Sequence, residues 1–227
     1  MIFDEVMTEL KRLSKPNKKD LEGMARYGIN VENAWCISVP KIRALGKKIG
    51  RDHELARKLW ASGIHEARWL TSMVEEPDKM TEEDMENYVK DFNSWDICDG
   101  MCSNLFDRTR FAYKKAEEWA GRDEEYVKRA GFVIMAALAI HDKKASNEPF
   151  EKFLEICKRE ATDERNFVRK AVNWALRQIS KSRNISLYKK GLKTADEIRE
   201  IDNKTAKWIA NDAIRELESE KIKKRFI

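Results

Sequence analysis

Apolar side chains recur with the helical period along almost the whole chain of 227 residues, and no stretch alternates apolar and polar residues as a half-buried strand does. With 37% charged residues and only 9 Gly and 4 Pro, the composition suits many surface helices and excludes a disordered chain or a β-sandwich. The chain is therefore predicted to be all-α. Helices are expected over 2–14, 18–27, 40–49, 52–61, 64–75, 81–90, 94–106, 110–119, 123–140, 147–159, 165–180, 183–190 and 203–218.

Punctuation between these segments agrees with the helical pattern. Pro40 is expected in a first helical turn, and Asn147 is expected to cap the helix whose first turn holds Pro149. The longest stretch without a helical pattern runs from Gly28 to Val39.

Four helices resemble one another, which suggests internal repeats. Each begins with polar residues, carries a charged residue early and continues with apolar residues, and each follows a shorter helix. The similar opening segments are 64–70, 125–131, 166–172 and 204–210. Two antiparallel helices in a unit of about 35–45 residues are typical of HEAT-like repeats. We expect a single domain over 1–227, a curved solenoid of HEAT-like antiparallel helix pairs with a basic concave face; an ordinary helical bundle is the alternative.

Charge and cysteine content narrow the class further. Lys and Arg number 45 against 40 Asp and Glu, a net charge of +5, which permits nucleic-acid binding without establishing it. Four cysteines do not make a disulfide scaffold, and no secretory signal opens the chain, so a cytoplasmic location is expected. The longest apolar run, 132–140, is too short to cross a bilayer, so no membrane segment is expected.

The segment 93–106 contains Asp99, a carboxylate at a helix position where apolar residues are expected. Asn93 or Ser94 is expected to cap its helix. One stripe of this helix consists of four residues spaced at i, i+4, i+7 and i+11, namely Trp95, Asp99, Cys102 and Phe106. Asp99 therefore lies among apolar side chains. It is either a structural partner of an arginine on the next helix or a carboxylate held in a cleft by a cationic partner or ligand.

Cysteine and histidine spacing points away from a metal site. Cys98 and Cys102 lie one helical turn apart. The histidines at comparable positions of their own helices, which could join them as ligands, are only His65 and His141. No zinc spacing results, and packing explains the two thiols better, so no metal is expected.

Arginine and tryptophan supply further candidates. Arg129 precedes the apolar run 132–140, which predicts a central buried helix; the guanidinium either reaches Asp99 or a phosphate, or is an ordinary surface arginine. Trp95 and Trp174 are expected on an open face because their stripes carry polar residues. The tryptophans expected first in the core are Trp60, Trp69, Trp119 and Trp208.

Basic residues gather in the last third of the chain. They form either a solvated face or a groove that tracks phosphates. They are Arg165, Arg169, Lys170, Arg177, Lys181, Arg183, Lys189, Lys190, Lys193 and the terminal run 221–225. No P-loop, nucleophile elbow or metalloprotease motif is present, which argues against a triad hydrolase or a nucleotide-fuelled enzyme.

Together these residues resemble the AlkD-type DNA alkylation repair glycosylases, a family of HEAT-like repeat proteins. The resemblance rests on Trp95-Asp96-x-x-Asp99, on Arg129 in the long central helix and on Trp174 within 167–181. It extends over nearly the whole chain through Tyr27-Gly28-Ile29, Pro40-Lys41-x-Arg43 and Ile64-His65-Glu66-x-Arg68. Two departures are Ser94, where some members carry an aromatic residue, and a longer 30–38 loop.

The resemblance implies a lesion site. Residues matching Trp95, Asp99 and Trp174 line that site in the family, and the residue matching Arg129 supports the carboxylate and the DNA backbone. Contacts to DNA are expected from Tyr27, Arg169, Lys170, Arg177, Lys181 and Arg183.

The expected activity is removal of cationic N3- or N7-alkylated purines from double-stranded DNA without base flipping. Asp99 would stabilise an oxocarbenium-like transition state and position water. The enzyme is expected to be a monofunctional monomer that needs no cofactor. The alternative is a non-catalytic HEAT-like module that binds DNA or protein partners; a scaffold binding acidic proteins is a third reading.

Overall fold

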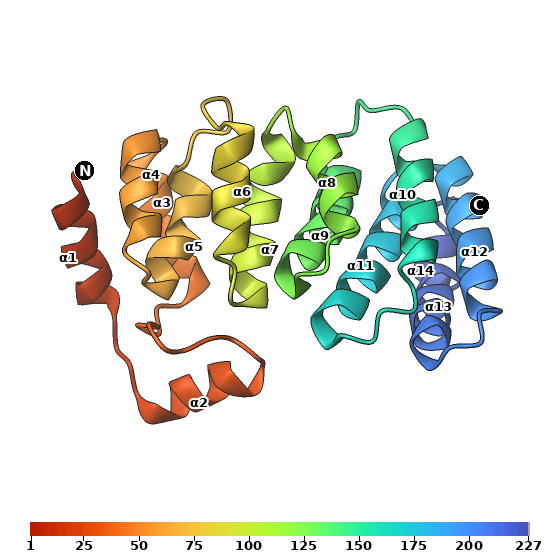
Figure 1. Ribbon diagram of the computed structural model, residues 1–227, viewed down its shortest axis with the longest axis horizontal. Coiled ribbons are helices and arrows are strands. Elements are labelled where there is room, and N and C mark those ends of the chain that lie inside the picture. The colour runs from red at the N-terminus through yellow and green to blue at the C-terminus, as the bar shows by residue number, and fades with distance from the viewer. Residues whose placement is uncertain (227) are drawn as a thin grey trace. The chain divides into compact units, whose positions relative to one another are not determined.

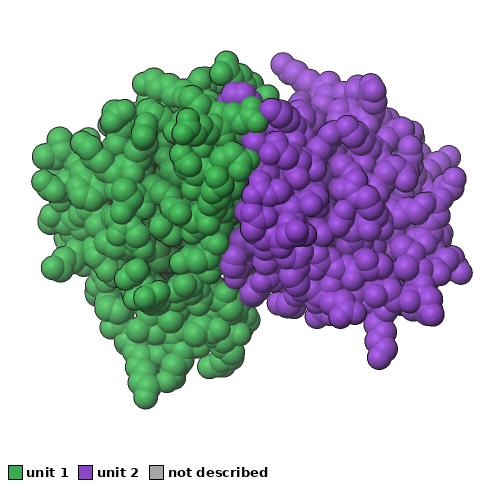
Figure 2. All heavy atoms as spheres, viewed as in Figure 1, with its two compact units in different colours: residues 1–110 green, residues 111–227 purple. Residues whose placement is uncertain are grey.

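The computed structural model describes residues 1–226, and within that range every regular element is a helix. The chain divides into two compact units, residues 1–110 and 111–227 (Figure 2). The first unit contains α1 (Phe3–Leu13), α2 (Lys18–Arg26), α3 (Val39–Ile49), α4 (His53–Ala61), α5 (His65–Val74), α6 (Glu82–Lys90), α7 (Trp95–Asn104) and a 3₁₀ turn, η1 (Phe106–Arg108). The second contains α8 (Ala112–Ala120), α9 (Glu125–His141), α10 (Glu148–Arg159), α11 (Asn166–Ser182), α12 (Ile185–Arg199), α13 (Lys204–Leu217) and α14 (Glu220–Lys223).

Local sequence signals account for most helix starts. Asn17, Asp52 and Thr81 each accept a hydrogen bond from a backbone N–H in the first turn of α2, α4 and α6. Pro40 and Pro149 lie in the first turns of α3 and α10, as predicted. Asn147 stands at the N-cap of α10 as predicted, but its side chain accepts from Asn184 Nδ2 at 2.8 Å and makes no capping hydrogen bond.

In the first unit, α5 is the central helix. It packs against α3, α4 and α7, and α1 covers α4 and α5. Trp60 and Trp69 are buried as predicted, at 6% and 7% exposed. By contrast α2, at the bottom of this unit in Figure 1, contains no buried residue.

In the second unit, α9 is the central helix, and Phe132–Ala139 is buried throughout, as predicted. It packs between α8 and α11. Gly131 makes the approach of α8 possible, since a Cβ there would lie 2.9 Å from the Ala116 carbonyl oxygen. Trp119 is fully buried on α8, also as predicted.

Two predictions about the helices and core of the second unit are wrong, and one helix was not predicted. The helix expected to end at residue 190 continues as α12 to Arg199. Gly191 within it allows a close approach to α11, since a Cβ there would lie 2.6 Å from Ser180 Cβ. The short helix α14 has no counterpart in the prediction. Trp208, expected in the core, is 39% exposed.

None of the helices in residues 1–226 combines the length and apolar character that crossing a membrane requires.

Candidate functional site

The start of α7 is locked to neighbouring elements of the first unit. Ser94 stands at the N-cap as predicted, but its side chain does not cap the helix. Its hydroxyl donates instead to Asp96 Oδ1 at 2.6 Å and accepts from the backbone N–H of Asn30 at 3.3 Å. The other carboxylate oxygen of Asp96 lies 2.8 Å from His65 Nε2 on α5. Burial alone would raise the pKa of Asp96, but the hydrogen bonds from His65 and Ser94 lower it, so this carboxylate is ionised.

The loop between α2 and α3 is held by a second carboxylate. Glu66 is 1% exposed, and its two oxygens accept from the backbone N–H groups of Trp35 at 2.8 Å and Ile37 at 3.1 Å. Where the loop begins after α2, Trp95 Nε1 donates a hydrogen bond to the carbonyl oxygen of Tyr27 at 2.9 Å. These bonds fix the position of the Trp95 indole relative to α5 and to the loop.

Trp95 and Asp99 line one open cavity of about 340 Å³ in the first unit. Both side chains are half-buried. Arg43 and Trp69 also line this cavity, and the Arg43 guanidinium lies 5.7 Å from the centre of the Trp69 ring. An exposed cation, two indoles and two half-buried carboxylates, Asp99 and Asp96, therefore share one opening, an arrangement able to receive a charged, flat ligand.

Sequence reasoning missed the role of two of these residues. Trp69 was assigned to the core, where it belongs, yet one part of it also lines the cavity. Arg43 was noticed only as part of the family resemblance. Helical periodicity does not show that α3 and α7 line the same cavity, so no local signal places Arg43 with Asp99.

A second cavity, of about 320 Å³, adjoins the first and shares Val39, Trp69 and Asp96 with it. Met24 of α2 lines its other side. Of the partly buried residues of α2, Met24 faces this cavity.

In the second unit, Arg129 is buried, with 6% of its surface exposed. Its Nη1 donates to the carbonyl oxygen of Phe167, at the start of α11, at 2.7 Å. The alternative of an ordinary surface arginine is therefore wrong. Trp174 lies about two turns further along α11 and is half-buried.

Three of the basic residues predicted to bind DNA have partners within the second unit. Arg177 and Lys181 both pair with Glu216, at 2.8 and 2.5 Å. Arg183 donates to the carbonyl oxygens of Asp142 and Ala145, and its guanidinium lies 4.2 Å from the centre of the Phe150 ring. The positive charges of Arg177, Lys181 and Arg183 are thus partly or wholly satisfied by partners within the protein.

Two of the other three predicted contacts are exposed. Tyr27 is 75% exposed in the first unit, and Lys170 is exposed in the second. Arg169 is half-buried, and its guanidinium lies 5.0 Å from the centre of the Trp208 ring.

The paired helices define the class, a helical repeat protein, and in its first unit Trp95 and Asp99 line one open cavity. Residues 6–217 match the DNA alkylation repair enzyme family, so the chain belongs to that family. A solved structure described as a new family of proteins related to the HEAT-like repeat DNA glycosylases, with affinity for branched DNA structures, has the same fold. The TM-score is 0.77 at 20% identity, over 95% of each chain. No curated protein sequence matches. The predicted HEAT-like all-α fold and the family resemblance are confirmed.

Proposed function

We propose that the protein is a monofunctional DNA glycosylase that removes cationic N3- or N7-alkylated purines from duplex DNA. Membership of the DNA alkylation repair enzyme family supports a role in repair. The observation that carries the proposal is the shared cavity of Trp95 and Asp99, which is open enough to meet DNA without a deep base pocket.

The chemistry suits a single carboxylate. In an N3- or N7-alkylpurine the base already carries positive charge, so the bond from C1′ to the base nitrogen breaks with its electron pair leaving on the base, which departs neutral. The sugar becomes oxocarbenium-like, and an anion beside it stabilises the transition state. Water then adds to C1′ and releases its proton to solvent.

Each site residue has a place in this reaction. Asp99 supplies the anion and orients water. Trp95, held by Tyr27, and Trp174 contact the cationic nucleotide through their ring faces. Arg129, in the second unit, is proposed to support the DNA backbone, as the family resemblance implies. Neither a Schiff-base lysine nor a cofactor has a step in this reaction, and we expect a monomer acting on cytoplasmic DNA without flipping the base.

Release of 7-methylguanine from a duplex tests this function. Asp99→Asn keeps the shape of the side chain and removes its charge, and should slow release by about 100-fold or more, the usual cost of losing a preorganised transition-state contact. Asp78→Asn is the matched control, since Asp78 is exposed and lies outside both cavities. Release by Asp99→Asn at the wild-type rate would overturn the mechanism.

A second candidate function is DNA binding without chemistry. The observation in its favour is the similar structure whose family is described as having affinity for branched DNA. This function predicts salt-dependent binding to branched DNA and no base release from any alkylated duplex. Release of base by the wild-type protein would exclude it as the whole function.

A further inference from the structure

Side-chain contacts between α11 and α13 advance together along both helices. Arg169 lies against Trp208, and Asn173 Nδ2 donates to the carbonyl oxygen of Ile209 at 3.1 Å. Further along, Arg177 pairs with Glu216. Because both residue numbers rise together, the two helices run in the same direction and begin at the same edge of the second unit.

The far end of this pair of helices is electrically neutralised. Arg177 Nε lies 3.7 Å from Asp212 Oδ2, and Glu216 serves both Arg177 and Lys181. Burial alone would raise the pKa of Glu216, but the hydrogen bond from Lys181 and the charge of Arg177 lower it, so Glu216 is ionised. Two cations therefore face two carboxylates here.

The end where α11 and α13 begin is different, because no carboxylate pairs with Arg169 there. Among residues 1–226, Arg169 makes no ion pair, and its buried Nε, like that of Arg177, has no hydrogen-bond partner. Its one side-chain hydrogen bond is a long contact of 3.5 Å from Nη2 to Asn166 Oδ1. Lys170, the next residue, and Lys204, one turn before Trp208 on α13, are exposed and form no ion pair within the described chain. A buried guanidinium N–H without an acceptor is costly unless a ligand supplies one.

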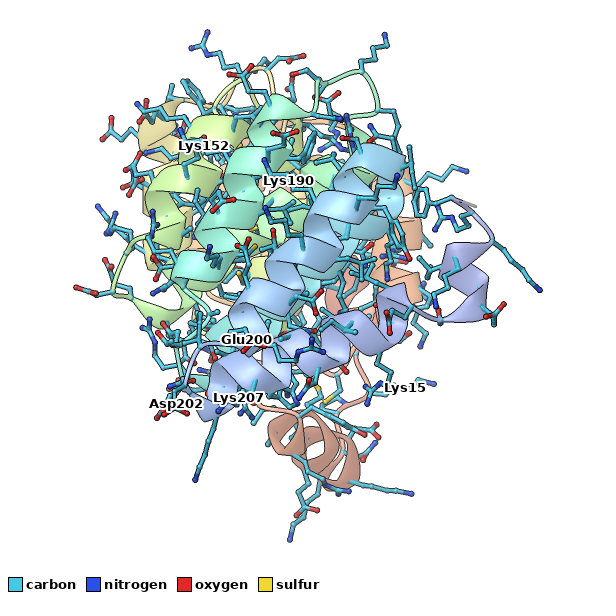
Figure 3. All side chains as sticks on the ribbon, turned by 90° about the vertical axis from the view of Figure 1, so that its right-hand side faces the viewer. Lys15, Lys152, Lys190, Glu200, Asp202 and Lys207 are labelled. Carbon is cyan, nitrogen blue, oxygen red and sulfur yellow. The ribbon has the colours of Figure 1, made fainter. Side chains whose placement is uncertain are left out.

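Trp208 at this end is the second unusual feature. It is 39% exposed, whereas Trp60, Trp69 and Trp119 are at most 7% exposed. The guanidinium of Arg169 lies over the ring. Exposed Lys207 pairs with Asp202, which lies just before α13 (Figure 3). An accessible indole beside unanswered positive charge is the combination that binds single-stranded nucleic acid: the ring stacks with a base and the cations hold its phosphates.

We propose that Trp208 and Arg169 form a stacking site for an unpaired DNA base, with the flanking phosphate held by Arg169, Lys170 and Lys204. In an intact duplex every internal base is already stacked on its neighbours, so this site selects DNA with a frayed, branched or single-stranded part. The inference rests on the proposed binding of DNA but not on base excision.

Binding of undamaged DNA tests the proposal. The probes are a blunt duplex and the same duplex with a single-stranded thymidine overhang, with 2-aminopurine replacing one overhang base as a fluorescent report of stacking. Wild type should prefer the overhang and quench the 2-aminopurine. Trp208→Ala should weaken overhang binding by about tenfold, as loss of one stacked base does, and abolish the quenching. Its affinity for the blunt duplex should stay unchanged.

Two further variants separate stacking from folding. Trp208→Phe keeps an aromatic ring and should retain most of the preference and the quenching. Ile185→Ala removes an apolar side chain of the same unit that is 40% exposed, and should behave as wild type. Thermal unfolding of all variants measures whether each still folds.

The outcomes distinguish this inference from the proposed function. Equal losses on both probes, or unchanged binding by a folded Trp208→Ala protein, would overturn the stacking site while leaving the glycosylase intact. Wild-type protein that binds neither probe at any salt concentration would overturn both. Normal overhang selectivity without release of 7-methylguanine would sustain the stacking site and remove the glycosylase.

Discussion

The start of α7 in the first unit and the α11–α13 edge in the second use carboxylates in opposite ways. Glu66 and Asp96 accept hydrogen bonds that hold a loop and a helix start in place. Asp212 and Glu216 instead neutralise cations, and so leave Arg169 as the basic residue of that row without an acidic partner in the described chain. In this protein the positions of the carboxylates, more than the number of basic residues, decide which cations are available to DNA.

This distinction matters because the excess of positive charge is small. A net charge of +5 over 227 residues gives little non-specific attraction when spread evenly. Because Arg177 and Lys181 pair internally, the unpaired positive charge lies at the start of α11, with Arg169, exposed Lys170 and Trp208.

The largest expected effect comes from breaking the loop clamp in the first unit. Glu66→Gln keeps the shape but turns one acceptor into a donor that faces a backbone N–H, so the free energy of unfolding should fall by about 3 kcal/mol. Urea unfolding measures this, and hydrogen exchange should show faster exchange of the Trp35 and Ile37 amides. Glu83→Gln, at an exposed position of α6, is the control. Unchanged exchange at Trp35 and Ile37 would show that Glu66 is not a clamp.

A smaller effect is expected at the acidic cluster of the second unit. Lys128 Nζ lies 2.6 Å from Glu160 and 3.0 Å from Asp163, and Arg165 also pairs with Asp163. Burial alone would raise the pKa of Asp163, but hydrogen bonds from Arg165 and Lys128 lower it to about 2.

Asp163 therefore contributes stability above its unfolded pKa of about 3.9, and that contribution disappears as pH falls through about 2. Asp163→Asn should lose about 2 kcal/mol of unfolding free energy near neutral pH, with a difference from wild type that narrows below about pH 4. Unfolding curves across this range check the sign, and Glu164→Gln, an exposed neighbour, is the control. A difference that widens in acid would contradict the assignment.

The smallest effect, and the sharpest test of the comparison, is a gain of binding. Glu216→Gln releases Arg177 and Lys181 from their shared carboxylate, so affinity for blunt duplex should rise severalfold. The slope of log affinity against log salt should steepen by about one. Glu218→Gln removes the same charge from an exposed residue without an ion pair in the described chain, and should change the slope less. Equal slopes in the two variants would mean that pairing does not control the availability of Arg177 and Lys181.

Most helices followed from local sequence. Helical period, caps such as Asp52 and Thr81, and first-turn prolines all act within a few residues, so their effect can be read along the chain. The errors have a common origin in contacts between helices. The packing of α12 against α11 at Gly191 and the contact of Trp208 with Arg169 are both set by neighbouring helices.

The candidate site divides in the same way. The spacing of Trp95 and Asp99 on one helical face was visible in the sequence, because i and i+4 positions always share a face. That Arg43 and Trp69 join them in one cavity was not visible, since three different helices contribute.

The amino-acid sequence alone determined that this chain is a series of paired helices with a carboxylate and an indole on one face of α7, because periodicity and capping are local properties. Only the tertiary structure decided which charges are paired and which are left for a ligand. Ion pairs such as Arg177–Glu216 join residues far apart in the chain, and their geometry depends on how the helices pack.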